Sequence, residues 1–252
     1  MSRDPAPLTL YLIRHGRMAF RGGAWSIARM NAYVTGREQA GLSARGAREA
    51  ERVADRLAAK GVTRIYSSAF QRAKETAVPL AKRTGIRTTT LGDLGELNPG
   101  AIEDDGFPRR LIELLGGVAG PGGMLPPGIA DPIKAGAGWY LTMHYLAQWL
   151  RGGTRDGEGV REGYERVVRA LNEVIRRNRG GGRAAVFTHG YFILLAVAHA
   201  ALTRPTNLRA LAGRTLLVPN GSVTKLAVGP GGELTLAYAF DVRHLRGRRA
   251  RA

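Results

Sequence analysis

Hydrophobic positions along the chain follow two spacings, one typical of strands and one typical of helices. Short apolar runs at residues 9–14, 63–67, 86–90 and 184–188 are bounded by glycine or polar turns, and we expect them to form strands. Residues 164–178 place apolar side chains at helical spacing, with arginine and glutamate between them. Because strands alternate with helices, we expect a three-layer α/β/α sandwich with a mostly parallel central sheet.

Capping residues and helix breakers set the bounds of several elements. Ser43 is a good N-cap for a helix that Gly61 is expected to stop. The helix that follows the second strand contains Pro79, which predicts a kink or an early end. Ser222–Val228 and Glu233–Phe240 flank a Gly-Pro-Gly-Gly turn and predict a hairpin at the edge of the sheet.

The middle of the chain is the least regular part. Helices are expected at residues 109–115 and 139–150, separated by a Gly- and Pro-rich stretch. The second helix is apolar on most faces, so it belongs either to the core or to a lid. We favour one domain over residues 1–252, with a lid or subdomain inserted at about 105–159. Residues 243–252 are basic and predict a disordered tail.

The composition excludes several classes of site. Of the 252 residues, 44% are hydrophobic, which is enough for a sizeable core. The absence of cysteine excludes disulfides, thiolate metal sites and a cysteine nucleophile. The longest apolar run, Tyr191–Leu202, is too short to span a bilayer, and the N-terminus lacks the apolar segment of a signal peptide. We therefore expect a cytoplasmic protein.

The net charge of +18 arises from 38 Lys and Arg against 20 Asp and Glu. Such a charge is typical of proteins that bind polyanions. Nearly all of the basic residues are arginine, however, and a GC-rich coding sequence produces the same bias without a functional cause. A compositional origin with one local anion site is the favoured reading, and weak polyanion binding through the arginine-rich surface is the alternative.

Candidate chemistry lies at the ends of three predicted strands. Two strands end in His-Gly, at Arg14–Gly16 and at His189–Gly190, and a third ends in Ser67–Ser68 with Arg72 one turn later. If these strands are neighbours, two imidazoles and two guanidiniums converge at one edge of the sheet. Guanidinium forks match phosphoryl oxygens, and the helix N-termini after Ser68 and Gly190 add backbone donors. These features predict a phosphate site.

In this order the motifs resemble those of the histidine phosphatase superfamily, whose fold is phosphoglycerate-mutase-like. The resemblance rests on Arg-His-Gly at 14–16, Leu-Ser-x-x-Gly-x-x-x-Ala at 42–50, Ser-Ser-x-x-x-Arg-Ala-x-x-Thr at 67–76, His-Gly at 189–190 and Asn-Gly-Ser-Val-Thr at 220–224. It implies a metal-independent phosphatase that hydrolyses a phosphate monoester, a small anionic metabolite, through a phosphohistidine intermediate.

The resemblance also implies roles for individual residues. His15 would be the nucleophile, and Arg14, Arg72 and His189 would hold the phosphoryl oxygens. The family has a Glu within a Leu-x-Glu-x-x-x-Gly pattern, so Glu96 would protonate the leaving oxygen and then activate water.

Three further residues are candidates for the site. Gly16 lets the backbone approach the phosphate closely, and Gly190 begins the helix whose N-terminus adds backbone donors. Glu103 is the alternative to Glu96 as the acid.

The chain departs from the mutases after its Arg-His-Gly motif. The mutases carry Glu and a Ser or Thr there, with an Asn further on, whereas this chain has Arg17, Met18 and Arg21. This argues against an ordinary glycolytic mutase. Arg17 and Arg21 would add positive charge at the mouth of the pocket and favour a further anionic group on the substrate.

Two alternatives stay open at this stage. A phosphoglycerate-type mutase shares the first half of the reaction, and a non-catalytic polyanion-binding protein would account for the charge. No metal or other cofactor is expected, because the histidines show no ligand spacing and no nucleotide-binding loop is present.

Overall fold

The computed structural model describes residues 7–19, 39–98, 100, 110, 146–152, 157–211 and 217–246. The chain divides into two compact units, and the central sheet belongs to the first, made of residues 1–20, 40–96 and 164–252. Most of residues 105–159 lie outside the described ranges, so a lid there stays a prediction.

A six-stranded sheet forms the middle layer, with the strand order β3-β2-β4-β1-β5-β6. The first four in this order are parallel, and β5 and β6 are antiparallel to their neighbours. The mostly parallel sheet and the hairpin at its edge are thereby confirmed. The strands are β1 (Leu8–Arg14), β2 (Arg64–Ser67), β3 (Thr88–Thr90), β4 (Gly182–Thr188), β5 (Val223–Val228) and β6 (Leu234–Asp241).

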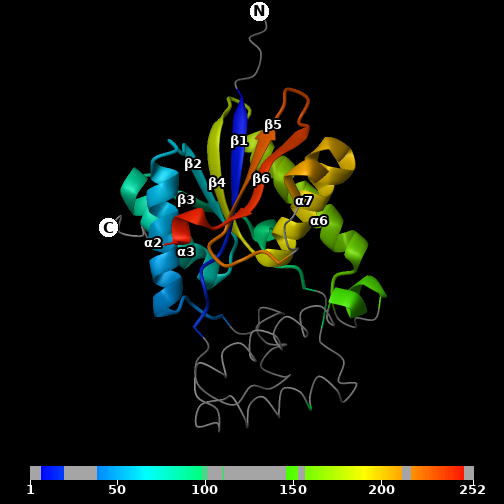
Figure 1. The fold of residues 1–252 in the computed structure, drawn as a ribbon, viewed down its shortest axis with the longest axis horizontal. Coiled ribbons are helices and arrows are strands. Elements are labelled where there is room, and N and C mark those ends of the chain that lie inside the picture. Colours follow the sequence, from blue (N-terminus) through cyan, green and yellow to red (C-terminus); the bar gives the residue numbers. More distant parts are fainter. Residues whose placement is uncertain are drawn as a thin grey trace, which may run out of the picture. The chain divides into compact units, whose positions relative to one another are not determined.

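Helices cover both faces of the sheet, with α2 and α3 on one side and α6 and α7 on the other (Figure 1). Alternation along β1 explains this arrangement, because its side chains are buried on both faces. Tyr11 and Ile13 pack with Val53 and Leu57 of α2. The helices are α2 (Ala44–Ala58), α3 (Gln71–Thr84), α6 (Val160–Arg177) and α7 (Gly190–Thr203), with short 3-10 turns η1 (Gly92–Leu94), η2 (Pro205–Leu211) and η3 (Arg243–Leu245).

The predicted N-cap is confirmed, and of the two effects expected of Pro79, a kink or an early end, the early end is wrong. The Ser43 side chain accepts a hydrogen bond from the backbone N–H of Gly46 at 3.1 Å. Pro79 is buried inside α3, which continues to Thr84. The proline removes one backbone hydrogen bond, but Ala77 and Leu80 on either side of it are buried in the core and keep the helix in place.

Two other expectations are corrected. The third strand is limited to Thr88–Thr90 rather than residues 86–90. The tail is ordered at its start, because Arg243–Leu245 form η3 and Arg243 binds the buried Asp241. The predicted helix at 109–115 lies outside the described residues except for Arg110, and only the end of the helix at 139–150 is described.

Within the described ranges, no helix combines the length and apolarity needed to cross a membrane.

Candidate active site

The first strand places His15 at its carboxyl end with a defined tautomer. The ring is buried, and its Nδ1 lies 2.8 Å from the carbonyl oxygen of Gly16. A carbonyl oxygen can only accept, so Nδ1 carries the proton and Nε2 keeps a lone pair. Arg72 Nε donates to that Nε2 at 3.2 Å. Burial, followed by the charges of Arg14 and Arg72, lowers the pKa of His15 well below its ordinary value. The imidazole is therefore neutral at physiological pH.

Close backbone packing holds the turn after His15. A Cβ on Gly16 would lie 2.6 Å from the carbonyl oxygen of Gly46, and a Cβ on Gly46 would lie 2.0 Å from that of Arg17. Both glycines therefore allow the start of α2 to contact this turn directly. The N–H of Gly16 donates to Thr76 Oγ1 at 3.0 Å, which connects the turn to α3. The motifs at residues 14–16, 42–50 and 67–76 therefore contact one another at this turn.

The segment before β5 supports the same turn from the other side. Gly221 N–H donates to the carbonyl oxygens of Arg14 at 3.0 Å and His15 at 3.2 Å. Asn220 Nδ2 donates to the His15 carbonyl at 3.1 Å, and Arg14 Nη1 donates to the carbonyl of Val218. The Asn-Gly-Ser-Val-Thr motif therefore positions the backbone of the two residues.

Parallel pairing of β1 with β4 brings the second histidine to the first. Arg14 pairs with Thr188, and the ring centroids of His15 and His189 are 5.1 Å apart. His189 is fully buried, with Nε2 2.8 Å from Ser68 Oγ. Burial, and after it the neighbouring His15 and arginine charges, lowers the pKa of His189. The two imidazoles and two guanidiniums predicted to converge lie together at this edge of the sheet.

Three buried nitrogens of this cluster have no hydrogen-bond partner within the described structure: Arg14 Nε, Arg72 Nη1 and His189 Nδ1. An unsatisfied buried donor is costly, by about 1–3 kcal/mol. Burial lowers the pKa of Arg72 to about 10, although the nearby Glu96 opposes the shift. Donors of this kind on neighbouring residues suit a bound anion.

The carboxylate of Glu96 lies at the N-terminus of α7. It accepts hydrogen bonds from the backbone N–H groups of Gly190 and Tyr191, both at 3.1 Å. Its negative charge raises the pKa values of both Arg14 and Arg72 against the effect of burial, so it lies within electrostatic reach of the cluster. Because Gly190 N–H binds Glu96 here, its predicted contact with phosphate stays a prediction.

Arg166 holds the loop that carries Glu96, a role the sequence did not indicate. From α6 it donates to the carbonyl oxygens of Asp93 at 2.7 Å, Gly95 at 3.1 Å and Glu96 at 3.2 Å. These contacts span about 70 residues of sequence, and no local spacing could have revealed them.

The chain is similar to known proteins over most of its length. The family model of the histidine phosphatase superfamily (branch 1) matches residues 10–110 and 138–240. The chain belongs to this superfamily.

Relatives within the superfamily carry the names of both mutases and phosphatases. Two proteins named "Probable phosphoglycerate mutase GpmB" are similar to the chain. That of Salmonella arizonae is 27% identical over 242 residues, covering 94% of this chain and 95% of the relative. That of Yersinia enterocolitica is 33% identical over 96 residues, which is 38% of this chain and 41% of the relative.

Solved structures of the superfamily share the fold. A phosphoglycerate mutase from Bacillus anthracis has a TM-score of 0.63 at 21% identity, with 96% of each chain covered. The mycobacterial glucosyl-3-phosphoglycerate phosphatase has a TM-score of 0.60 at 19% identity, covering 94% of this chain and all of that one. The phosphoglycerate-mutase-like fold is thus confirmed.

Two residues predicted for the histidine phosphatase site, Arg21 and Glu103, lie outside the described residues. Arg17 is exposed, and its backbone N–H donates to Glu49 at 2.9 Å.

Within the described part of the chain, no three His, Asp or Glu side chains gather closely enough to hold a metal ion.

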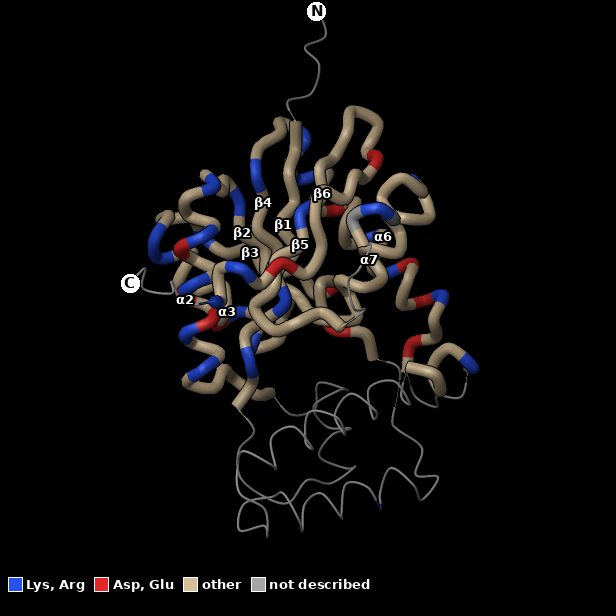
Figure 2. Tube along the Cα trace, viewed as in Figure 1, with Lys and Arg blue, Asp and Glu red and all other residues tan. Residues whose placement is uncertain are grey.

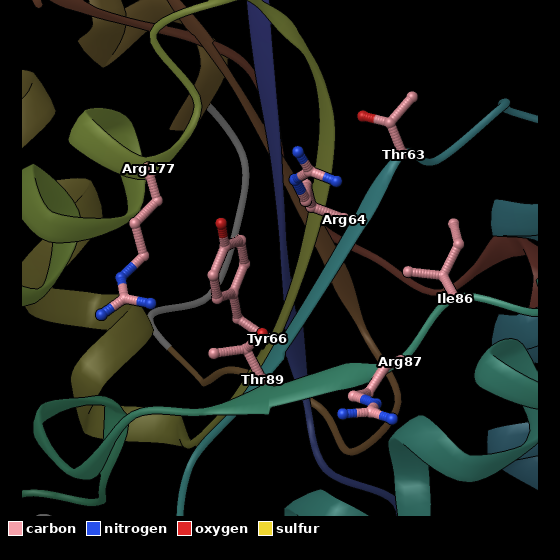
Figure 3. A pocket seen from close by; sticks show the side chains of 7 residues that line it. All are labelled: Thr63, Arg64, Tyr66, Ile86, Arg87, Thr89 and Arg177. Atoms are coloured by element: carbon pink, nitrogen blue, oxygen red, sulfur yellow. The ribbon is translucent and has the colours of Figure 1, made fainter.

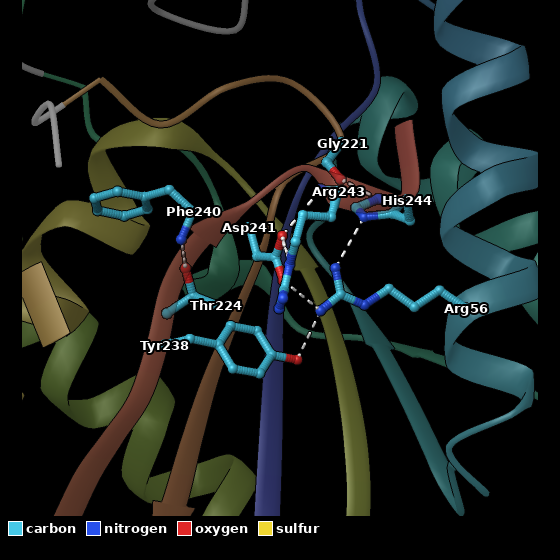
Figure 4. Close-up of polar contacts among 8 residues, drawn as sticks. All are labelled: Arg56, Gly221, Thr224, Tyr238, Phe240, Asp241, Arg243 and His244. Carbon is cyan, nitrogen blue, oxygen red and sulfur yellow. Dashed lines mark hydrogen bonds and ion pairs between the residues drawn. The ribbon is translucent and has the colours of Figure 1, made fainter. Parts of the chain in front are cut away.

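A second cationic cluster lies next to the segment that supports His15 (Figure 4). Arg56 of α2 binds Asp241 at 2.9 Å and Tyr238 at 3.0 Å. It also donates to Nδ1 of His244 at 2.9 Å, so His244 Nε2 carries the proton and donates to the Gly221 carbonyl at 2.9 Å. We refer to Arg56, Tyr238, Asp241, Arg243 and His244 as the Asp241 cluster. No motif in the sequence indicates this cluster.

Proposed function

We propose that the protein hydrolyses a phosphate monoester through a phosphohistidine on His15, without a metal ion. The observation that carries this proposal is the set of buried nitrogens on Arg14, Arg72 and His189 that have no partner in the described structure, close to the neutral imidazole of His15. A phosphoryl group would supply acceptors for all three donors and an electrophile for Nε2 of His15. The substrate would be a small phosphate ester.

In the first step, the hydrogen bond from Arg72 Nε to His15 Nε2 breaks, the Nε2 lone pair attacks phosphorus, and the bond from phosphorus to the ester oxygen breaks. Arg14, Arg72 and His189 donate to the three non-bridging oxygens, whose charge shifts in the transition state. His189 can donate from Nδ1 while the Ser68 hydroxyl donates to Nε2. Glu96 enters this step as the carboxylic acid and gives its proton to the leaving oxygen, because a bare alkoxide leaves poorly.

In the second step, the Glu96 carboxylate takes a proton from water. The water oxygen attacks phosphorus and the bond between phosphorus and Nε2 breaks, which releases inorganic phosphate and restores neutral His15. The tautomer set by the Gly16 carbonyl is the one this cycle requires, since Nε2 is the unprotonated nitrogen at both ends.

The test is release of phosphate from an aryl phosphate in the presence of a chelator, with His15→Ala as the matched control. We expect turnover by the natural protein and a loss of more than about 10³-fold in the variant. A ³¹P resonance of phosphohistidine after rapid acid-free quenching would identify the intermediate. Turnover that survives in His15→Ala, or that the chelator abolishes, would overturn the proposal.

A phosphoglycerate-type mutase is the second candidate, favoured by the GpmB relative that covers nearly the whole chain. It shares the first step and differs in the acceptor, a second substrate hydroxyl in place of water. Supplying 3-phosphoglycerate separates the two: conversion to 2-phosphoglycerate indicates a mutase, and free phosphate indicates a hydrolase.

Weak binding of polyanions is a separate, non-catalytic alternative based on charge. Lys and Arg are spread over helices and strands along the chain (Figure 2). Nucleic-acid retention that depends on salt and persists in His15→Ala, without phosphate release by the natural protein, would favour it.

A further inference from the structure

Phe70 precedes α3 at a position where its side chain does nothing for the helix. It is the N-cap residue, and its side chain makes no capping hydrogen bond. Ser, Thr, Asp and Asn are the usual N-cap residues, because their side-chain oxygen accepts a hydrogen bond from a backbone N–H of the first turn. A local preference set aside in this way is typical of a functional site. The half-buried ring of Phe70 instead contacts the candidate active site.

The ring of Phe70 contacts two of the side chains proposed to bind the phosphoryl group. The guanidinium carbon of Arg72 lies over the ring, 4.5 Å from its centroid. The imidazole of His189 lies 4.9 Å from the same ring, centroid to centroid, at an interplanar angle of 70°. The backbone N–H of Phe70 donates to Ser68 Oγ at 3.4 Å, and that hydroxyl lies 2.8 Å from His189 Nε2. Phe70 therefore contacts Arg72 directly and His189 both directly and through Ser68.

The same ring packs against the loop that carries Glu96. A Cβ on Gly95 would lie 3.2 Å from Phe70 Cε2, so the backbone just before Glu96 lies against the ring. One side chain thus contacts the proposed phosphate-binding groups and the loop of the proposed acid, all within the first compact unit.

An aromatic ring can orient a guanidinium without occupying its hydrogen-bond donors. Burial lowers the pKa of Arg72 to about 10 and so disfavours its charged form, whereas the negative face of an aromatic ring favours it. Arg72 Nη1 and His189 Nδ1 have no partner in the described structure despite these contacts. A carboxylate in place of the ring would bind such nitrogens, as Asp241 binds Arg56.

We propose that Phe70 is a positioning residue for phosphoryl transfer. Its ring fixes the orientation of Arg72 and His189 and leaves Arg72 Nη1 and His189 Nδ1 for the phosphoryl oxygens. This inference rests on the function proposed for the His15 site. It adds an aromatic side chain on which the binding of the phosphoryl group depends.

A matched control position lies at the other end of the same strands. Ile86, just before β3, lines a pocket of about 540 Å³ together with Thr63 and Arg64 at the amino end of β2 (Figure 3). Phe70 follows the carboxyl end of β2, which is parallel to β3. Ile86 is half-buried, as Phe70 is, and packs against the core. Ile86→Ala therefore removes apolar packing away from the active site.

The test compares Phe70→Leu, which keeps apolar bulk without an aromatic face, with Phe70→Tyr, which keeps the ring. We measure kcat/KM for an aryl phosphate and the dissociation constant of orthovanadate, and thermal melting checks that each variant folds. We expect Phe70→Leu to lower kcat/KM about tenfold and to weaken vanadate binding by a similar factor. Phe70→Tyr and Ile86→Ala should stay within about twofold of the natural protein in both quantities.

Pentafluorophenylalanine incorporated at position 70 separates the aromatic face from packing. Fluorination reverses the charge of the ring face and keeps an apolar ring, so we expect a loss similar to that of Phe70→Leu. The inference is overturned if Phe70→Leu or the fluorinated protein stays within twofold of the natural protein in both measurements, or if Ile86→Ala loses as much as Phe70→Leu. A natural protein that neither releases phosphate nor binds vanadate would instead overturn the proposed function, and this inference with it.

Discussion

The active-site cluster and the Asp241 cluster are built from the same kinds of side chain, yet they are completed in different ways. Each gathers two arginines with histidine at one end of the sheet. In the Asp241 cluster a buried carboxylate accepts from Arg56 and from Arg243, at 2.9 and 2.7 Å. In the active-site cluster, Arg14, Arg72 and His189 each keep a buried nitrogen that has no partner among the described residues.

This difference marks the Asp241 cluster as structural and the active-site cluster as suited to binding a ligand. Burial alone raises the pKa of Asp241, but the hydrogen bonds from Arg243 and the charge of Arg56 outweigh it and hold the pKa well below its usual value. The carboxylate therefore stays charged and neutralises its own cations. In the active site the nearby Glu96 carboxylate binds backbone N–H groups of α7, and the buried nitrogens of Arg14, Arg72 and His189 have no partner in the described structure, so part of the interaction energy is kept for a ligand.

The comparison predicts that Arg72→Ala mainly impairs activity. The variant loses a donor to His15 Nε2 and a nitrogen available to the phosphoryl group, so we expect kcat/KM to fall roughly 10³-fold. Its free energy of unfolding should stay within about 1 kcal/mol of the natural protein, because an unsatisfied buried donor is removed with the side chain. Phosphatase kinetics and urea unfolding on the same sample measure both. A large loss of stability with kcat/KM unchanged would contradict the comparison.

Arg56→Ala should lower stability more than activity, the reverse of Arg72→Ala. Its side chain is 15% exposed and that of Asp241 only 4%, so the variant leaves a buried carboxylate with one partner fewer. We expect a loss of about 2–3 kcal/mol in urea unfolding, below the full effect of a broken buried pair because Arg243 remains. Arg45→Ala is the matched control, since its i,i+4 pair with Glu49 is exposed on the arginine side and should contribute less than about 1 kcal/mol. Equal losses in the two variants would mean that burial of Asp241 has no consequence.

Orthovanadate, a phosphate analogue, should stabilise only a protein with an intact active-site cluster. A ligand at 100 times its dissociation constant stabilises the folded state by about 2.7 kcal/mol. We therefore expect the melting temperature of the natural protein to rise with vanadate and that of Arg72→Ala to change little. Arg56→Ala should start lower and rise by a similar amount, because its active-site donors are unchanged. A vanadate response that depended on Arg56 and not on Arg72 would reverse the assignment of the two clusters.

The contrast between the two clusters also explains what the sequence could predict. Strands that end in His-Gly give a local signal, and parallel pairing then dictates that His15 and His189 meet. Arg56, Asp241 and His244 have no such signal: they come from α2, the end of β6 and η3, and only the folded chain brings them together. The same holds for Arg166, whose partners lie far away in sequence. Of the two effects expected of Pro79, the early helix end does not occur, because tertiary packing outweighs the local preference.

His244 connects the two clusters, so its substitution should affect activity modestly. Its Nε2–H donates to the carbonyl of Gly221, whose own N–H donates to the carbonyl oxygens of Arg14 and His15. We expect His244→Ala to lower kcat about fivefold with KM within about twofold, since a positioning contact is lost. His244→Gln keeps an N–H donor near the same place and should recover most of kcat. Tyr238→Phe removes another partner of Arg56 and should leave kcat unchanged.

The dependence of stability on pH gives the smallest expected effect. Burial, followed by the charge of Arg56, lowers the pKa of His244 from 6.5 to about 4. Between these values the unfolded chain takes up a proton that the folded protein does not, so stability falls as the pH drops from 6.5 towards 4. Arg52 opposes protonation further, whereas Asp241 and the Gly221 carbonyl favour it.

His15 and His189, with lowered pKa values, contribute a fall of the same sign, so a variant is needed to isolate His244. We expect urea unfolding of His244→Gln to lose about 1 kcal/mol less between pH 7 and pH 5 than the natural protein, after allowance for the partial exposure of the ring. An identical loss in both proteins would mean that His244 titrates normally in the folded state. Its hydrogen bond from Arg56, which requires an unprotonated Nδ1, would then not persist in solution.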